Sequence, residues 1–242
     1  MPISRSHKII FVHIPKTGGG SIEKALGIYG IKNKGCNIHC NKMLYGYREA
    51  TDERYIEFED SCYKRAGFNC CNRGLNKWLK RNIIKPDYDN ENNALQHLTM
   101  REISKHIIWD NYFKFAFVRN PFERLVSEYF WRLKNNHLHG DTVFPDFVEN
   151  VVSKEYTHDK HLMPQYLFVT NTKKEIIVNR IGKFESMTED FESIMHSKNL
   201  FIKLPVVHKS KKYDYRDYYD NETLRIVTDI YSEDLNLFNY RY

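Results

Sequence analysis

The chain has 242 residues, of which 41% are hydrophobic, 28% charged and 14% aromatic. This composition excludes a disordered tail, collagen and a coiled coil, and it predicts one folded domain with embellishments. No run reaches the roughly 18 uninterrupted apolar residues of a membrane-spanning helix, and no basic-then-apolar leader precedes the first patterned element, near Lys8. We therefore expect a soluble protein without a cleaved signal peptide.

The charge balance favours an anionic ligand. The chain has 37 Lys and Arg against 31 Asp and Glu, a formal net charge of +6, and the basic residues recur along its whole length. Nucleic acid is a weak candidate partner, because the sequence has no Lys/Arg-rich block and no zinc-finger spacing.

Five cysteines lie close together in the sequence, at Cys36, Cys40, Cys62, Cys70 and Cys71. Their odd number and the lack of a leader suggest reduced thiols, whereas a lumenal protein could pair four of them and leave one free. A zinc site is a further alternative, but the spacings are irregular and lack two CxxC knuckles. Ordinary buried or half-buried thiols are the default interpretation.

The first predicted elements are a strand and a helix joined by glycines. Residues 8–14 (KIIFVHI) form a β-branched apolar run that ends at Pro15, where a strand should stop because proline lacks the amide donor. Three glycines then precede helix-forming residues, which predicts a tight turn opening a helix that ends near Gly27 or Gly30.

Residues 31–86 show no clean period of 2 or 3.6 and are not assigned, apart from a short strand at 82–85. Further along, Thr99 and Glu102 have the spacing of a capping box, in which the hydroxyl bonds the Glu102 amide and the carboxylate reaches back. His97 then lies just outside the N-terminus of a helix.

The remaining elements alternate in the same way. A second strand at 112–118 ends at Arg119-Asn-Pro, and an amphipathic helix follows to about Asn135. Later patterns predict a helix at 144–152, an aromatic turn or short helix at 161–168, a strand at 176–184, a helix from Ser186 and a last helix at 222–235.

Strands followed by helices at this rhythm predict an α/β fold, with a mostly parallel central sheet flanked by helices. In such a fold ligands bind beyond the carboxyl ends of the strands, and segments 15–21 and 119–127 both fall at such ends. We expect a single domain over residues 1–242, in which 31–86 is an insertion or a substrate-side segment.

The segment IPKTGGGSI (14–22) has the groups that an oxyanion site needs. It offers unhindered glycine amides, a helix N-terminus, the hydroxyls of Thr17 and Ser21 and the cation of Lys16. It is not a Walker A sequence, because Lys16 precedes the glycines instead of following them. A glycine-rich turn without a ligand is the alternative.

A second motif, RNPFERLVS, places a serine eight residues after Arg119 at the end of a strand. The first turns of the next helix could bring the hydroxyl of Ser127 near the same anion, and a guanidinium and a hydroxyl suit a phosphate monoester. Alone, a strand-end arginine is more often a surface ion pair.

Together, IPKTGGGSI and VRNPFERLVSEY resemble the two cofactor-binding signatures of sulfotransferases that use 3′-phosphoadenosine 5′-phosphosulfate (PAPS). The resemblance is strongest to the carbohydrate sulfotransferase family, which contains the heparan and chondroitin enzymes. Similar segments follow in the expected order at 96–99 (QHLT), 161–169, 181–191 and 208–222. The resemblance covers most of the chain, and residues 31–86 are its least family-like part.

The resemblance implies a P-loop NTPase-like three-layer fold and a sulfuryl transfer from PAPS to a hydroxyl, with adenosine 3′,5′-bisphosphate (PAP) as product. It assigns the 5′-phosphosulfate to Lys16, Thr17, Gly18, Gly19, Gly20 and Ser21. It assigns the 3′-phosphate to Arg119 and Ser127. It also implies a late basic loop that closes over the cofactor, formed by Lys209, Ser210 and Lys211. Many members have threonine at the position of Gly20, so one hydroxyl donor is absent here.

Sulfuryl transfer resembles phosphoryl transfer, in which catalysis is mainly positioning and electrostatics. Lys16 can stabilise the leaving group, and the acceptor hydroxyl needs a base, for which histidine is suited. The family's HLT position makes His97 the candidate base, although a lone histidine before a helix is more often structural. His161 and Gln165 match a segment near the acceptor in relatives. No metal is required.

Three alternatives stay open. A nucleotide or sugar kinase with a divergent phosphate loop would need Mg²⁺ and prefer ATP. A non-catalytic glycan- or nucleotide-binding module would bind without turnover, and a nucleic-acid binder would show steep salt dependence.

We expect a carbohydrate or other hydroxyl-bearing acceptor. We expect the protein to be cytoplasmic, or Golgi-lumenal if an anchor precedes this sequence, as in animal relatives.

Overall fold

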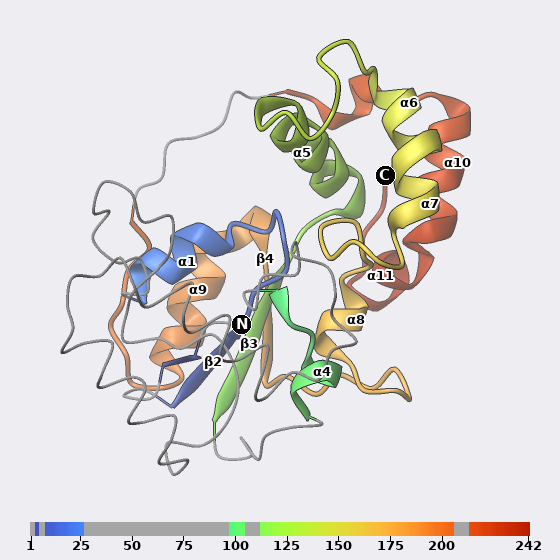
Figure 1. Ribbon diagram of the computed structural model, residues 1–242. Coiled ribbons are helices and arrows are strands. Elements are labelled where there is room, and N and C mark those ends of the chain that lie inside the picture. Colours follow the sequence, from blue (N-terminus) through green and yellow to red (C-terminus); the bar gives the residue numbers. More distant parts are fainter. Residues whose placement is uncertain (1–2, 5–7, 27–96, 105–111, 206–212) are drawn as a thin grey trace, which may run out of the picture.

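The computed structural model describes residues 3–4, 8–26, 97–104, 112–205 and 213–242 (Figure 1). The unassigned segment 31–86, the predicted strand at 82–85, the five cysteines and Lys209, Ser210 and Lys211 lie outside these ranges.

Four strands form one sheet in the order β1-β2-β3-β4. Their bounds are Ile3–Ser4 for β1, Ile9–Val12 for β2, Phe113–Val118 for β3 and Arg180–Lys183 for β4. The pairs β2–β3 and β3–β4 are parallel, and only the edge pair β1–β2 is antiparallel among the described strands. The predicted mixed α/β architecture with a mostly parallel sheet is therefore confirmed.

Helices flank this sheet. Their bounds are α1 Gly19–Ala25, α4 Met100–Ser104, α5 Pro121–Lys134, α6 Phe144–Phe147, α7 Ser153–Glu155, α8 Tyr166–Val169, α9 Met187–His196, α10 Asn221–Ile230 and α11 Ser232–Leu237. A π-helical turn, Val148–Val152, joins α6 to α7, and 3-10 turns lie at Phe184–Ser186 and Tyr215–Tyr218. Figure 1 shows α1 and α9 on one side of the strands and α4 and α8 on the other.

The sheet is apolar on both faces. All four residues of β2 are fully buried, although alternate side chains point to opposite faces of a strand. The last four residues of β3, Phe115 to Val118, are fully buried as well. Such continuous burial is typical of parallel strands covered by helices on both sides.

Several local patterns fold as the sequence predicts. The Thr99 amide donates to Glu102 Oε2 at 2.7 Å, and the Glu102 amide donates to Thr99 Oγ1 at 3.2 Å, so the capping box at α4 is confirmed. At α5, the Asn120 side chain accepts from the Phe122 amide at 3.0 Å, with proline in the first turn.

Two predicted elements differ from the structure. The single helix at 222–235 is wrong, because α10 ends at Ile230 and α11 begins at Ser232. Tyr231, between them, is buried and donates its hydroxyl to the Leu162 carbonyl at 2.5 Å, a contact that helical periodicity alone does not reveal. The strand at 176–184 is shortened to β4, because Ile176 forms an isolated antiparallel bridge with Thr170.

Within the described ranges, no helix has both the length and the apolar character needed to cross a membrane.

Candidate active site

The loop after β2 turns sharply into α1. Lys16 has a φ of 68° and Gly18 a φ of 79°, so the chain is left-handed at both positions, which costs glycine nothing. The hydroxyl of Thr17, a fully buried residue, donates to the Ile14 carbonyl at 2.9 Å and holds the turn. Gly18 caps α1 without a side chain, so no side-chain oxygen occupies the amides of the first turn.

Gly19 opens α1 against the ring of His13. A Cβ atom at this position would lie 2.0 Å from His13 Nε2, so the loop can approach the imidazole only with glycine there. On the other side of the ring, His13 Nδ1 lies 2.5 Å from Glu23 Oε1, and both residues are buried. The buried pair of His13 and Glu23 therefore packs beneath the glycine loop.

Arg119 follows β3 and reaches back to this loop. Its Nη1 donates to the Lys16 carbonyl at 3.2 Å, its Nη2 donates to Glu123 Oε1 at 2.7 Å, and its guanidinium lies 4.0 Å from the ring centroid of Phe184. Arg119 Nε is buried and has no hydrogen-bond partner among the described residues. The two predicted motifs are thus in direct contact.

Ser127 is half-buried on α5, and both Ser127 and Arg119 influence the pKa of Tyr213. Burial raises the pKa of the Tyr213 phenol, while the charge of Arg119 and hydrogen bonding from Ser127 and Arg119 act in the opposite direction. Both members of the predicted pair, Arg119 and Ser127, therefore act on the same phenol. Sequence reasoning missed Tyr213, because it stands at the edge of the basic loop with no motif of its own.

His97 lies between two other histidines. Its ring centroid is 4.6 Å from that of His13 and 5.2 Å from that of His161. His97 Nδ1 lies 3.0 Å from the His13 carbonyl oxygen, and since a carbonyl only accepts, Nδ1 must carry the proton. Burial and the two neighbouring imidazoles hold the pKa of His97 well below its usual value, so the neutral ring offers Nε2 as a base.

His161 is held by a buried carboxylate. Its Nδ1 lies 3.0 Å from Glu128 Oε2, and Glu128 Oε1 accepts from Arg132 Nε at 2.8 Å. Burial alone would raise the pKa of the Glu128 carboxyl, but His161, Arg132 and Lys16 together bring it below its ordinary value. A fully buried carboxylate thus stands beside the imidazoles.

Trp131 links this carboxylate and histidine pair to the glycine loop. Its ring stacks on His161 at 4.9 Å between centroids, and Lys16 Nζ lies 5.6 Å from the indole centroid. Burial lowers the pKa of Lys16 to about 8, Glu128 raises it in part, and Arg119 adds to the lowering. Lys16 and His97, the two predicted catalytic residues, therefore belong to one cluster of side chains in contact, with His13, His161, Glu128 and Trp131.

Gln165 is fully buried, and its side-chain amide meets the backbone of Arg119. Its assignment to acceptor binding stays a prediction. Gly20 and Ser21 are half-buried in the first turn of α1, where the Ser21 amide donates to the Gly18 carbonyl at 2.9 Å.

Sequence reasoning missed three residues of the cluster. His13 carried a signal, since it is the polar position in an otherwise apolar strand segment. Glu128 and Trp131 on α5 carried none, because a carboxylate and an indole on an amphipathic helix are ordinary. Within the described ranges, no three His, Cys, Asp or Glu side chains converge in a way suited to a metal ion.

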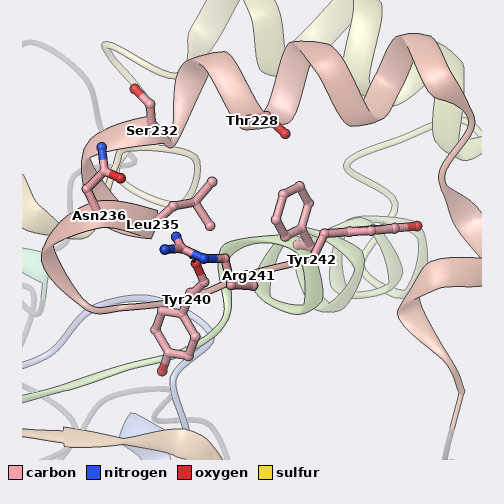
Figure 2. A pocket seen from close by; sticks show the side chains of 8 residues that line it. Thr228, Ser232, Leu235, Asn236, Tyr240, Arg241 and Tyr242 are labelled. Carbon is pink, nitrogen blue, oxygen red and sulfur yellow. Dashed lines mark hydrogen bonds between the residues drawn. The ribbon is translucent and has the colours of Figure 1, made fainter.

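A surface pocket of about 300 Å³ lies apart from this cluster, between α10, α11 and the C-terminal residues. Figure 2 shows Leu235, Tyr240 and Tyr242 among its lining side chains. None of the predicted site residues within the described ranges lines it, and its lining carries no second charged side chain to join Arg241 on an anion.

Comparison with known proteins identifies the family. The sulfotransferase family profile matches residues 1–241. The chain belongs to the sulfotransferase family. This sulfotransferase is also 30% identical over 99 residues to an uncharacterized protein of Archaeoglobus fulgidus, which covers 41% of the chain and 78% of that protein. No solved structure matches the sulfotransferase chain.

The close contact of Gly19 with His13 generates the first test. Gly19→Ala should lower the free energy of unfolding of the sulfotransferase by about 1–3 kcal/mol, because the new methyl group must displace a buried imidazole. Gly140→Ala is the matched control, since nothing lies within 4 Å of its Cβ position. Urea unfolding measures both, and equal stability of the two variants would contradict the close packing.

Proposed function

We propose that the chain transfers a sulfuryl group from PAPS to a hydroxyl of a carbohydrate acceptor and releases PAP. The observation that carries this proposal is the hydrogen bond from Arg119 to the Lys16 carbonyl, which joins two anion-binding motifs in a sulfotransferase-family chain. We further propose that residues 1–242 form one domain with a P-loop-like arrangement of the sheet and the glycine loop.

The residues present fit a bisphosphorylated nucleotide. Arg119 keeps a buried Nε donor for which the described residues offer no acceptor, as expected where an anion binds. At the glycine loop, Lys16, the hydroxyl of Ser21 and the amides of residues 18–20 would hold the 5′-phosphosulfate, and Thr17 would shape the turn. Arg119 and Ser127 would hold the 3′-phosphate.

In this proposal bound PAPS would supply an activated sulfuryl group: the acceptor oxygen would bond to sulfur, the bond from sulfur to the phosphate oxygen would break, and PAP would leave. Lys16 neutralises the charge that gathers on the leaving phosphate oxygen, and its place beside Trp131 makes that charge interaction stronger than in water. His97 accepts the acceptor's hydroxyl proton at Nε2, because its Nδ1 is committed to the His13 carbonyl. His161, 5.2 Å away between ring centroids, borders the acceptor hydroxyl.

Nucleotide selectivity tests the donor class. PAP should raise the melting temperature more than 5′-AMP, ADP or ATP-Mg²⁺, because ligand binding stabilises the native state by mass action. Arg119→Ala should remove the preference for PAP, whereas Arg225→Ala, which removes exposed ion pairs with Glu222 and Asp229, should keep it. Thermal-shift titrations with each nucleotide provide the measurement.

A preference for ATP-Mg²⁺ would overturn the proposal in favour of the kinase alternative. PAP selectivity without transfer to any hydroxyl acceptor would support the non-catalytic module instead.

Removal of the candidate base tests the mechanism. His97→Ala should lower kcat by about 10²–10⁴-fold, the range of a lost general base, while PAP affinity stays within about twofold. His139→Ala, at a largely exposed histidine, is the control. In the wild type, the lowered pKa of His97 keeps the base deprotonated, so kcat should not fall between pH 8 and pH 6.5. Full activity of His97→Ala would move the base elsewhere, with His161 the next candidate.

The pKa of Lys16, about 8, predicts a pH-dependent affinity for PAP. The lysine loses its charge as the pH rises through this value, so affinity should fall by about tenfold from pH 7 to pH 9. Lys16→Arg should flatten the profile, because a guanidinium stays charged throughout this range. Calorimetric titration with PAP checks both proteins, and a flat wild-type profile would exclude a titrating Lys16.

A further inference from the structure

The side chain of Gln165 pairs with Arg119 as a neighbouring strand would. The Arg119 amide donates to Gln165 Oε1 at 2.9 Å, and Gln165 Nε2 donates to the Arg119 carbonyl at 2.9 Å. An exchange of both bonds with one residue is the pattern of a hydrogen-bonded pair in an antiparallel sheet. Arg119 lies one residue beyond the last residue of β3, so this side chain continues the pairing where β3 ends.

Asp234 of α11 holds Gln165 in place. One carboxylate oxygen accepts from the backbone amide of Gln165 at 2.7 Å. The other accepts from the backbone amide of Tyr166 at 2.7 Å, at the start of α8. Gln165 Nε2 lies 3.4 Å from the first of these oxygens. Asp234 and Gln165 are both fully buried, so water does not compete for these bonds.

The position of the Arg119 backbone decides where its guanidinium lies. The guanidinium contacts Lys16, Glu123 and Phe184, three residues from different segments of the chain. A backbone shift at Arg119 would misalign all three contacts at once. In a catalytic site a displacement of about 1 Å can lower the rate a hundredfold, and we expect a comparable sensitivity of affinity at this anion contact.

We propose that Gln165, held by Asp234, is a positioning residue that fixes the backbone of Arg119 and thereby sets selectivity for a 3′-phosphorylated nucleotide. The inference rests on the proposed function, since it takes Arg119 to bind the 3′-phosphate. It differs from an acceptor contact by Gln165, which would affect the KM of the acceptor and leave nucleotide selectivity unchanged.

The test compares PAP with 5′-AMP, which lacks the 3′-phosphate. Gln165→Met keeps the shape of the side chain and removes its two hydrogen bonds to the Arg119 backbone and the longer one to Asp234, so PAP affinity should fall by about tenfold to a hundredfold. Affinity for 5′-AMP should change by less than about twofold, and the ratio of the two should shrink accordingly. Isothermal titration calorimetry on the full chain gives both affinities.

Asn179→Leu is the matched control. Asn179 Oδ1 accepts from the Lys114 amide at 2.7 Å, and the Asn179 amide donates to the Lys114 carbonyl at 2.7 Å, at the opposite end of β3. This variant therefore loses a side-chain bond to the same strand far from Arg119. Its melting temperature should fall while its ratio of PAP to 5′-AMP affinity stays that of the wild type.

Asp234→Asn provides a second variant in case Gln165→Met does not fold. It keeps one acceptor oxygen and replaces the other by an NH2 group that faces a backbone N–H donor, so it should reduce the affinity ratio in the same direction. Combined with Gln165→Met, it should add less than its effect alone, because both act on one chain of hydrogen bonds.

The outcomes separate this inference from the proposed function. A wild-type protein without preference for PAP would overturn both. A preference that survives in Gln165→Met and Asp234→Asn, with or without a raised acceptor KM, would overturn only the role of Gln165. A reduced ratio in these two variants, with the ratio retained in Asn179→Leu, would support it.

Discussion

The parallel pairing of β2 with β3 is the constraint on which the rest of the site depends. Val12 pairs with Ala116, so the two strands end side by side and release their loops at the same edge of the sheet. This pairing brings Lys16 and Arg119 together although 103 positions separate them in the sequence. Both strands are apolar along their buried lengths, and the polar residues His13, Lys16 and Arg119 follow where they end.

Three histidine rings lie in contact at the site, and the described residues include no group suited to a metal ion. In each ring Nδ1 faces an oxygen, namely a carboxylate oxygen of Glu23 for His13, the His13 carbonyl for His97 and Glu128 for His161. Each contact fixes a ring orientation. For His97, burial lowers basicity but keeps the ring neutral, so the site has a weaker base that is available over a wider range of pH.

The parts of the structure that follow local patterns could be predicted from the sequence. Proline after an apolar run, three glycines before a helix and the capping box of Thr99 act through neighbours within a few residues. The contacts of Glu128, Trp131 and Tyr213 could not be predicted, because their partners are far away in the sequence and any amphipathic helix or polar loop can carry such residues. The break at Tyr231 was missed for the same reason, since its cause is a tertiary hydrogen bond to the Leu162 carbonyl.

The bond between Arg119 and the Lys16 carbonyl has a mechanical consequence. It ties the strand end that carries the guanidinium to the backbone of the glycine loop, so the two cationic positions are held at a set separation. Under the proposed function, a molecule with two anionic groups at the matching spacing would gain both contacts, and one with another spacing would gain only one. Charge alone would attract many anions, so in this proposal the fixed separation accounts for the selection among them.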